Sequence, residues 1–371
     1  MRGIQTGLAL VVAFLLGGAP VAWAQQAQRT LHPVVFAHGL AGYDDLLGFD
    51  YFGDELGNFV GDACNELLEL SCNPHLNPGQ RAFGAQVQAF HSSEVRGLDL
   101  ANDVESVLAT TGATRANIVG HSQGGMDARK AAKVLFERHG RAVVDVLVSV
   151  SSPHRGSPVA KYVLDLGPGV SSVLDALLNI YGNAIYQPGN DAIASLKQLI
   201  YDDHDPNDGV TTGAKAFNVA NPMDPRYVSH YASLMTAQVG LDVNPAFFLL
   251  RLALYDIDGD GYCVDDCDND GAAGQGDGIR NERDDDGVVG INSQQMGPRL
   301  RYTESLLGLD TIGVDGSVAP VTNLNTPDSA QMTSLSSVID QDHLDVTGLG
   351  PDLFNELEFY AAVIHYVSQN E

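Results

Sequence analysis

The sequence predicts an α/β fold in which a mostly parallel, doubly wound sheet carries helices on both faces. Three apolar, β-branched runs, at 33–37, 87–90 and 143–150, are typical of strands that are buried on both faces. Between them, 100–108 has apolar residues at helical spacing, and a second helical stretch follows 118–119. Because strands alternate with helices along the chain, a parallel sheet is expected. The 371 residues, 44% apolar and 18% charged, have globular composition.

The strongest motif is the pentapeptide Gly120-His121-Ser122-Gln123-Gly124. A G-x-S-x-G pattern alone is weak evidence in a chain with 40 glycines, so its context decides. Here Ile118-Val119 precedes it as a strand, and a helical stretch through Leu135 follows at once. This context predicts a sharp turn that exposes Ser122 as a nucleophile, with glycines where a Cβ would not fit.

A second turn and a final helix complete the expected scaffold. The run 33–37 leads into His38-Gly39-Leu40-Ala41-Gly42, where this architecture places an oxyanion donor. We therefore expect the backbone N–H groups of Leu40 and Gln123 to form an oxyanion hole. A final amphipathic helix is predicted from the spacing of Leu353, Leu357, Tyr360, Ile364 and Val367.

Charge and the N-terminal segment limit the partners and the location of the protein. The net charge of −27 argues against nucleic acid and anionic membrane surfaces, and it favours cations. Residues 1–24 have a basic start, a short apolar core and an Ala22-Trp23-Ala24 cleavage site, which predicts a signal peptide and a secreted chain of 25–371 without a stable membrane anchor. Export permits disulfides. Four cysteines allow three pairings, among which the local pairs Cys64–Cys72 and Cys263–Cys267 are expected.

Several segments together resemble one enzyme family. HPVVFAHGLAG (32–42), SSEVRG (92–97), ATTGATRANIVGHSQGG (109–125) and SSPHRGS (151–157) resemble the secreted triacylglycerol lipases of Pseudomonas and Burkholderia type. The resemblance implies the α/β-hydrolase fold, a lipid or ester substrate at an oil–water interface, and a dedicated folding chaperone as a possible partner. It is dense from about 32 to 160 and sparse afterwards.

The order of a catalytic triad in this fold is Ser, then Asp or Glu, then His. His343 lies in Asp342-His343-Leu344-Asp345, a His-Leu-Asp like that of the family's base, and precedes the final helix. For the acid, Asp286 and Asp208 both precede Gly-Val, and Asp286 is preferred because DGVVG resembles the family's strand end. The 57 residues from Asp286 to His343 exceed the family's spacing, which implies an insertion at 298–338.

The resemblance also implies a structural Ca²⁺ near the base. Asp242, in a segment like the family's upstream motif, and Asp345, just after His343, are the expected ligands. The sequence departs from the family at 349, where Leu349 replaces a glutamine. An ion at this position would hold the loop that carries His343.

A second calcium site is expected in an Asp-rich insertion, 256–286, which holds eleven Asp and one Glu against two Arg. Asp256, Asp258, Asp260 and Gly261 match the first half of an EF-hand loop, although Cys267 stands where that loop has its bidentate Glu. The segment resembles the cysteine-linked calcium repeats of thrombospondin type more than a paired EF-hand. A solvated acidic linker is the alternative.

The segment 155–231 is expected to form a cap, and an apolar stripe at 170–181 suggests a lid. The predicted function is a secreted serine ester hydrolase, a triacylglycerol lipase above all. Two alternatives remain open: a short-chain esterase or polyester depolymerase, and a catalytically inactive calcium-dependent binding protein.

Overall fold

A six-stranded sheet forms the centre of the protein, and every neighbouring pair of its strands is parallel. Its order is β12-β9-β8-β7-β1-β6. The predicted parallel sheet is therefore confirmed. The computed structural model describes residues 26–42, 45–46, 49–50, 52–54, 57–58, 73–165, 190–201, 213–238, 243, 247, 283–306, 308–348 and 354–371. The strands are β1 (Val34–Ala37), β6 (Ala82–Gly84), β7 (Ala116–His121), β8 (Val144–Val150), β9 (Val228–Thr236) and β12 (Val338–Ile339).

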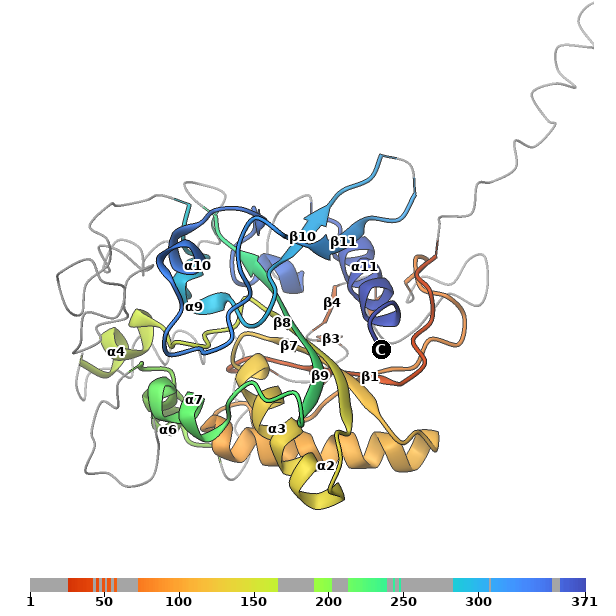
Figure 1. Ribbon diagram of the computed structural model, residues 1–371, viewed down its shortest axis with the longest axis horizontal. Helices are drawn as coiled ribbons and strands as arrows, with labels where there is room; N and C mark the ends of the chain where they lie inside the picture. The colour runs from red at the N-terminus through yellow and green to blue at the C-terminus, as the bar shows by residue number, and fades with distance from the viewer. Residues whose placement is uncertain are drawn as a thin grey trace, which may run out of the picture.

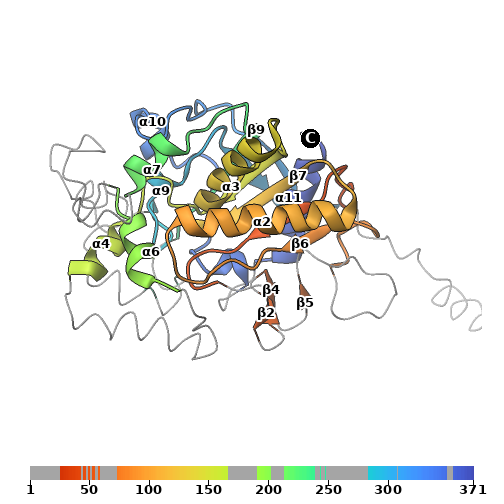
Figure 2. The same cartoon turned by 90° about the horizontal axis from the view of Figure 1, so that it is seen from below.

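Helices cover both faces of this sheet, as a doubly wound fold requires (Figures 1 and 2). Val35 and Ala37 of β1 pack toward α2 (Ser93–Thr111) and α3 (Gln123–His139). Val34 and Phe36 pack on the opposite face, toward α11 (Glu356–Ser368). The alternation follows from the period of two along a strand. All seven residues of β8 are buried, which explains the nearly continuous apolar run in its sequence.

Smaller elements surround the sheet. Antiparallel pairs join β2 to β3, β4 to β5, and β10 to β11. The strands of these pairs are Asp45–Leu46, Phe49–Asp50, Gly53–Asp54, Gly57–Asn58, Leu300–Thr303 and Thr311–Val314. The remaining helices are α4 (Pro158–Asp165), α6 (Ala192–Gln198), α7 (Ala214–Ala220), α9 (Ile291–Gln294), α10 (Ser329–Thr333) and η3 (Asp345–Thr347).

Three expectations need correction. The run 87–90 is not a strand: the edge strand is β6, and Val87, Ala89 and Phe90 are buried in loop positions, which produced their strand-like apolar pattern. Residues 228–231 lie in β9, within the central sheet, so they are not part of a cap. The final helix is buried almost throughout from Phe359 to Val367 rather than along one stripe, because it packs between the sheet and the β10–β11 pair.

Other expectations fall outside the described residues. These are the signal segment 1–24, all four cysteines, the stripe 170–181, Asp208, Asp242, Leu349, and the part of the Asp-rich insertion that precedes Arg283. Of the expected insertion 298–338, the structure describes β10, β11, α10 and the first residue of β12. No helix among the described residues is long and apolar enough to cross a membrane.

Candidate active site

Ser122 occupies the turn between β7 and α3, at the carboxyl edge of the sheet. Its backbone has φ 53° and ψ −132°, a strained conformation for a residue with a side chain. A Cβ on Gly120 would lie 2.6 Å from the backbone of Gly124, and a Cβ on Gly124 would lie 2.2 Å from the carbonyl oxygen of Ala37. The two glycines are thus required sterically, and the turn has the geometry expected of a nucleophile elbow.

The three residues chosen from the sequence lie in one hydrogen-bonded chain. His343 Nε2 is 2.8 Å from Ser122 Oγ, and His343 Nδ1 is 2.7 Å from Asp286 Oδ2. Asp286 is fully buried, while Ser122 and His343 are 7% and 6% exposed. In the sequence, His343 lies 221 positions after Ser122 and 57 positions after Asp286, and the fold brings all three together.

Asp286 is surrounded by hydrogen-bond donors. Its Oδ1 accepts the N–H groups of Val288 (3.1 Å) and Val289 (2.7 Å). Its Oδ2 accepts from Thr236 Oγ1 (3.2 Å) and Gln294 Nε2 (3.4 Å) besides His343. These donors hold the carboxylate in one orientation. Such a carboxylate can orient the imidazole and stabilise its protonated form.

Backbone bonds hold the loop that carries His343. The N–H of His343 donates to the carbonyl of Asp286 at 2.9 Å. On the other side, His121 Nε2 lies 3.0 Å from the carbonyl oxygen of His343. Burial, with a contribution from His343, lowers the pKa of His121 well below its ordinary value, so this ring is neutral and donates its one N–H to that carbonyl.

The expected oxyanion donors lie on two turns that meet. Gln123 is the first residue of α3, so its N–H has no partner within the helix. Leu40 follows β1, whose last carbonyl approaches Gly124 so closely that no Cβ fits between them. Arg96 donates to the carbonyls of His38 (2.7 Å) and Gly39 (3.1 Å). Because a trans peptide points its N–H opposite to its C=O, the second bond turns the N–H of Leu40 away from Arg96.

Apolar side chains flank each polar group of the site. Leu40, Val288 and Leu344 pack against a buried cluster that includes Met126 and Phe247. The ring of Phe247 meets that of His343 edge to face, with centroids 6.5 Å apart. Limited water access and fixed donors make the arrangement suited to proton transfer from Ser122 and to attack of its oxygen on a carbonyl carbon.

Of the expected calcium ligands, only Asp345 lies among the described residues. Asp345 is 1% exposed, and its Oδ2 accepts the N–H of Asp342. In turn, Oδ1 of Asp342 accepts the N–H groups of Leu344 and Asp345. Two buried carboxylates beside the His343 loop suit a hard cation. Within the described ranges, however, no three His, Cys, Asp or Glu side chains gather into a metal-binding group. Asp256, Asp258 and Asp260 fall outside those ranges, as does Asp242.

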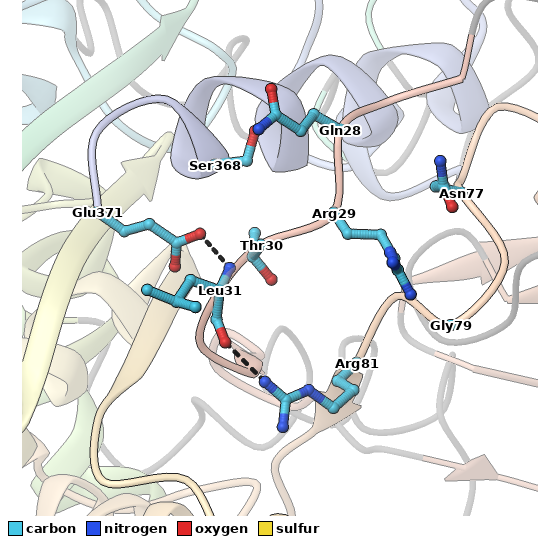
Figure 3. A pocket seen from close by; sticks show the side chains of 9 residues that line it. All are labelled: Gln28, Arg29, Thr30, Leu31, Asn77, Gly79, Arg81, Ser368 and Glu371. Carbon is cyan, nitrogen blue, oxygen red and sulfur yellow. Dashed lines mark hydrogen bonds between the residues drawn. The ribbon is translucent and has the colours of Figure 1, made fainter.

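A cavity of about 820 Å³ lies elsewhere, between the 28–31 segment, the 77–81 loop and the end of α11 (Figure 3). Glu371 accepts the N–H groups of Leu31 and His32 there, and Arg81 donates to the carbonyl of Leu31. None of the predicted site residues lines it. This cavity therefore belongs to the packing of the N-terminal segment rather than to the candidate active site.

Among the described residues, four polar side chains that contact the site were not foreseen as functional: Arg96, His121, Thr236 and Gln294. Arg96 and His121 lie within motifs that carried the family resemblance, but a motif does not reveal which loop a side chain reaches. Thr236 ends a strand that the sequence did not predict, and Gln294 lies just after DGVVG (286–290), in a segment for which no function was predicted. Their roles depend on contacts between distant segments.

Comparison with known proteins agrees with this geometry. The chain is 34% identical over 181 residues to a triacylglycerol lipase of Vibrio cholerae, covering 46% of this chain and 51% of the relative. It is 31% identical over 204 residues to a triacylglycerol lipase of Burkholderia plantarii, covering 52% and 51%. The chain thus spans about half the length of the curated relatives it matches.

Similarity in structure extends further along the chain. Lipase 1 from Pelosinus fermentans superposes with a TM-score of 0.52 at 16% identity, over 92% of this chain and 99% of that one, which shows a shared fold. A family model described as alpha/beta hydrolase fold matches residues 32–249, more than half of the sequence. The strained serine turn, the parallel sheet and this match agree, and the chain belongs to the α/β-hydrolase-fold family.

Proposed function

We propose that this protein is a secreted serine ester hydrolase that acts on triacylglycerols, with Ser122, His343 and Asp286 as its catalytic triad. The observation that carries the proposal is the hydrogen-bonded chain from Asp286 through His343 to Ser122 at a strained turn. The names of the relatives from Vibrio and Burkholderia support a lipid substrate.

In the first half-reaction His343 Nε2 takes the proton of Ser122 Oγ as that oxygen attacks the ester carbonyl carbon. The electron pair of the C=O bond moves to oxygen, and the N–H groups of Leu40 and Gln123 bind the resulting oxyanion. Asp286 keeps the Nδ1 proton of the imidazole in place and stabilises the positive charge. Collapse of the intermediate breaks the ester C–O bond, and His343 protonates the departing alcohol.

The second half-reaction repeats these roles with water. His343 removes a proton from the water as its oxygen attacks the acyl carbon, and the same two N–H groups bind the oxyanion. When the bond to Ser122 breaks, His343 returns the proton to Oγ, and the fatty acid leaves. The apolar residues beside the triad, Leu40, Val288 and Leu344, are suited to an acyl chain.

The experiment that tests this function measures fatty-acid release from emulsified triolein and from tributyrin by the full mature protein and by Ser122→Ala. Activity on both substrates that Ser122→Ala abolishes supports a lipase. Hydrolysis of tributyrin alone, with a preference for short p-nitrophenyl esters, indicates the esterase alternative. A folded, calcium-loaded protein without activity on either substrate contradicts the proposal and favours a binding protein.

Calcium and export belong to the same proposal. Ca²⁺ held by Asp242 and Asp345 would restrain the loop of His343, and a second ion at Asp256, Asp258 and Asp260 would order the segment before Asp286. Buried Asp345, two positions after His343, supports the first site, and the charge of the insertion supports the second.

We further propose cleavage after Ala24, a lid within 155–227 and assistance by a dedicated folding chaperone. Expression without a chaperone that yields fully active enzyme contradicts the last point.

A further inference from the structure

Two side chains besides His343 contact the same oxygen of Asp286. Thr236 Oγ1 is 3.2 Å and Gln294 Nε2 is 3.4 Å from Oδ2, while His343 Nδ1 is 2.7 Å from it. Asp286 and its two additional donors, Thr236 and Gln294, are fully buried. In both contacts the side chain donates, the threonine through its hydroxyl and the glutamine through its amide, and the carboxylate oxygen accepts.

The hydroxyl of Thr236 also contacts a second hydroxyl group, that of Ser151. Thr236 is the last residue of β9, and Ser151 Oγ lies 2.6 Å from its Oγ1. Since the proton of Thr236 points to Asp286, the hydroxyl of Ser151 donates to Thr236. Ser151 follows β8 with φ 51°, a left-handed backbone conformation that is strained for a residue with a side chain. Ser151, Thr236 and Asp286 therefore form a directed chain of donors that ends on the carboxylate.

Gln294 links the same strand end to the loop of Asp286. Its Oε1 accepts the N–H of Thr236 at 2.8 Å, and its Nε2 donates to the carbonyl of Thr236 at 2.9 Å. The same Nε2 also donates to the carbonyl of Val289 at 3.0 Å. One buried amide thus fixes the end of β9 relative to residues 286–289.

We propose that Thr236 and Gln294 are positioning residues for ester hydrolysis, acting through Asp286; this inference rests on the proposed triad. Both contact the oxygen that faces His343, while the N–H groups of Val288 and Val289 bind the other oxygen, so rotation of the carboxylate away from the imidazole would break these contacts. The contact gains importance as the imidazole becomes positively charged, which happens in the transition state. Their removal therefore lowers kcat more than it changes KM.

The test compares Thr236→Val, Thr236→Ser, Gln294→Met and Gln295→Met in the full mature enzyme. Gln295 is the matched control: it is buried beside Gln294, but its side chain bonds to Gly297, Ala319 and Arg299 instead of Asp286. The measurements are kcat and KM on p-nitrophenyl butyrate and the thermal midpoint of each variant. Thr236→Val and Gln294→Met are expected to lower kcat about tenfold with KM within about twofold, because the first loses a hydrogen bond to the carboxylate and the second loses the amide that holds Thr236 and Val289 beside it.

Thr236→Ser keeps the hydroxyl and is expected to retain most of the activity, while Gln295→Met lowers the midpoint without the loss of kcat. Folded Thr236→Val and Gln294→Met variants with wild-type kcat overturn the inference, as does an equal loss of kcat in Gln295→Met. If Thr236→Val does not fold, the two glutamine variants decide alone. A wild-type enzyme whose hydrolysis does not depend on Ser122 instead overturns the proposed function, so the two failures are distinguishable.

Discussion

At the scale of single residues, the site depends on a few atoms that have no freedom to move. Ser122 keeps a strained backbone because Gly120 lets the turn close on Gly124, and Gly124 lets the turn pack against Ala37 at the end of β1. The carboxylate of Asp286 receives five donors, of which two are backbone N–H groups of its own loop. Strain and burial of this kind persist where the surrounding structure determines one conformation.

The choice between two acids gives the first prediction. Asp286→Asn is expected to lower kcat by about 10⁴, because the N–H groups of Val288 and Val289 would bind the amide oxygen, and the amide NH2 would then face Nδ1 and favour the wrong tautomer of His343. Asp208→Asn, with the same chemical change, is expected to leave kcat within about twofold. The measurement is kcat on p-nitrophenyl butyrate for both variants. Loss of activity in Asp208→Asn alone would exchange the two assignments.

A second prediction concerns Gly124→Ala. The added Cβ would lie 2.2 Å from the carbonyl oxygen of Ala37, which is backbone and cannot yield easily. We expect a loss of stability of about 3 kcal/mol together with loss of activity, since either β1 or the elbow must shift. Urea unfolding and ester hydrolysis check this. Gly140→Ala is the comparison, because no atom within 4 Å meets its Cβ; the strain of its positive φ alone is expected to cost about 1 kcal/mol.

At the scale of elements, Arg96 connects helix α2 to helix α3 and to the turn 38–42, which carries the expected oxyanion donor Leu40 and is called the oxyanion turn below. Arg96 Nε donates to Asp127 at 2.8 Å, and both side chains are fully buried. The rest of the guanidinium binds backbone carbonyls on both sides of the turn, among them His38, Gly39 and Ala89. Ala89 also accepts the N–H of Ala41, so the turn is held at both ends.

Arg96→Met is therefore expected to cost about 3–5 kcal/mol, because it leaves Asp127 buried without its partner. Adding Asp127→Leu is expected to restore much of the stability but not the activity, since the apolar pair cannot orient the peptide before Leu40. Denaturant unfolding and kcat, measured on the same samples, separate the two effects. Full activity in the stabilised double variant would show that Arg96 is not needed to orient the peptide before Leu40.

In the 298–338 segment, the buried carboxylate of Asp315 contributes to stability through its hydrogen bonds. Burial alone raises the pKa of Asp315, but the hydroxyls of Ser317, Ser336 and Ser337 outweigh it and hold that pKa well below its usual range. A lowered pKa means that the group stabilises the fold above its unfolded pKa of about 3.9, and that this contribution is lost as the pH falls further. Asp315→Ala is expected to lower the thermal midpoint by about 5 °C at pH 7. The difference from wild type should shrink below about pH 4, and a constant difference from pH 7 to pH 2 would contradict this account.

At the scale of the whole molecule, a net charge of −27 predicts that cations stabilise the folded protein. Calcium is expected to raise the thermal midpoint at concentrations far below those at which NaCl acts by screening, because a ligand that binds only the folded state stabilises it by mass action. EDTA should reverse the increase and reduce ester hydrolysis.

Variants assign this effect to its two proposed sites. Asp345→Asn is expected to weaken the response to calcium and to lower kcat, whereas joint replacement of Asp256, Asp258 and Asp260 by Asn removes the remaining response. Glu137→Gln, an equal change of charge on the exposed side of α3, should leave the response intact. A midpoint that exhaustive chelation does not change contradicts both sites.

The sequence by itself determined the local parts of this protein. The buried runs at 33–37 and 143–150, the helix after Ser122 and the two glycines of its turn follow from periodicity and sterics within a few residues. Ser122, His343 and Asp286 could be chosen because each lies in a short motif and their order along the chain is restricted. The edge strand escaped prediction, because loop residues 87–90 show the same buried apolar pattern as a strand.

Only the tertiary structure decided which side chains reach the site from elsewhere. Thr236, Gln294 and Arg96 contact Asp286 or the oxyanion turn across 50, 8 and up to 58 positions, and no local pattern encodes such contacts. A hydrogen bond depends on distance and direction in space, whereas a motif records only spacing along the chain. For this reason the three residues of the proposed triad could be chosen from the sequence, and the side chains that contact them from distant segments could not.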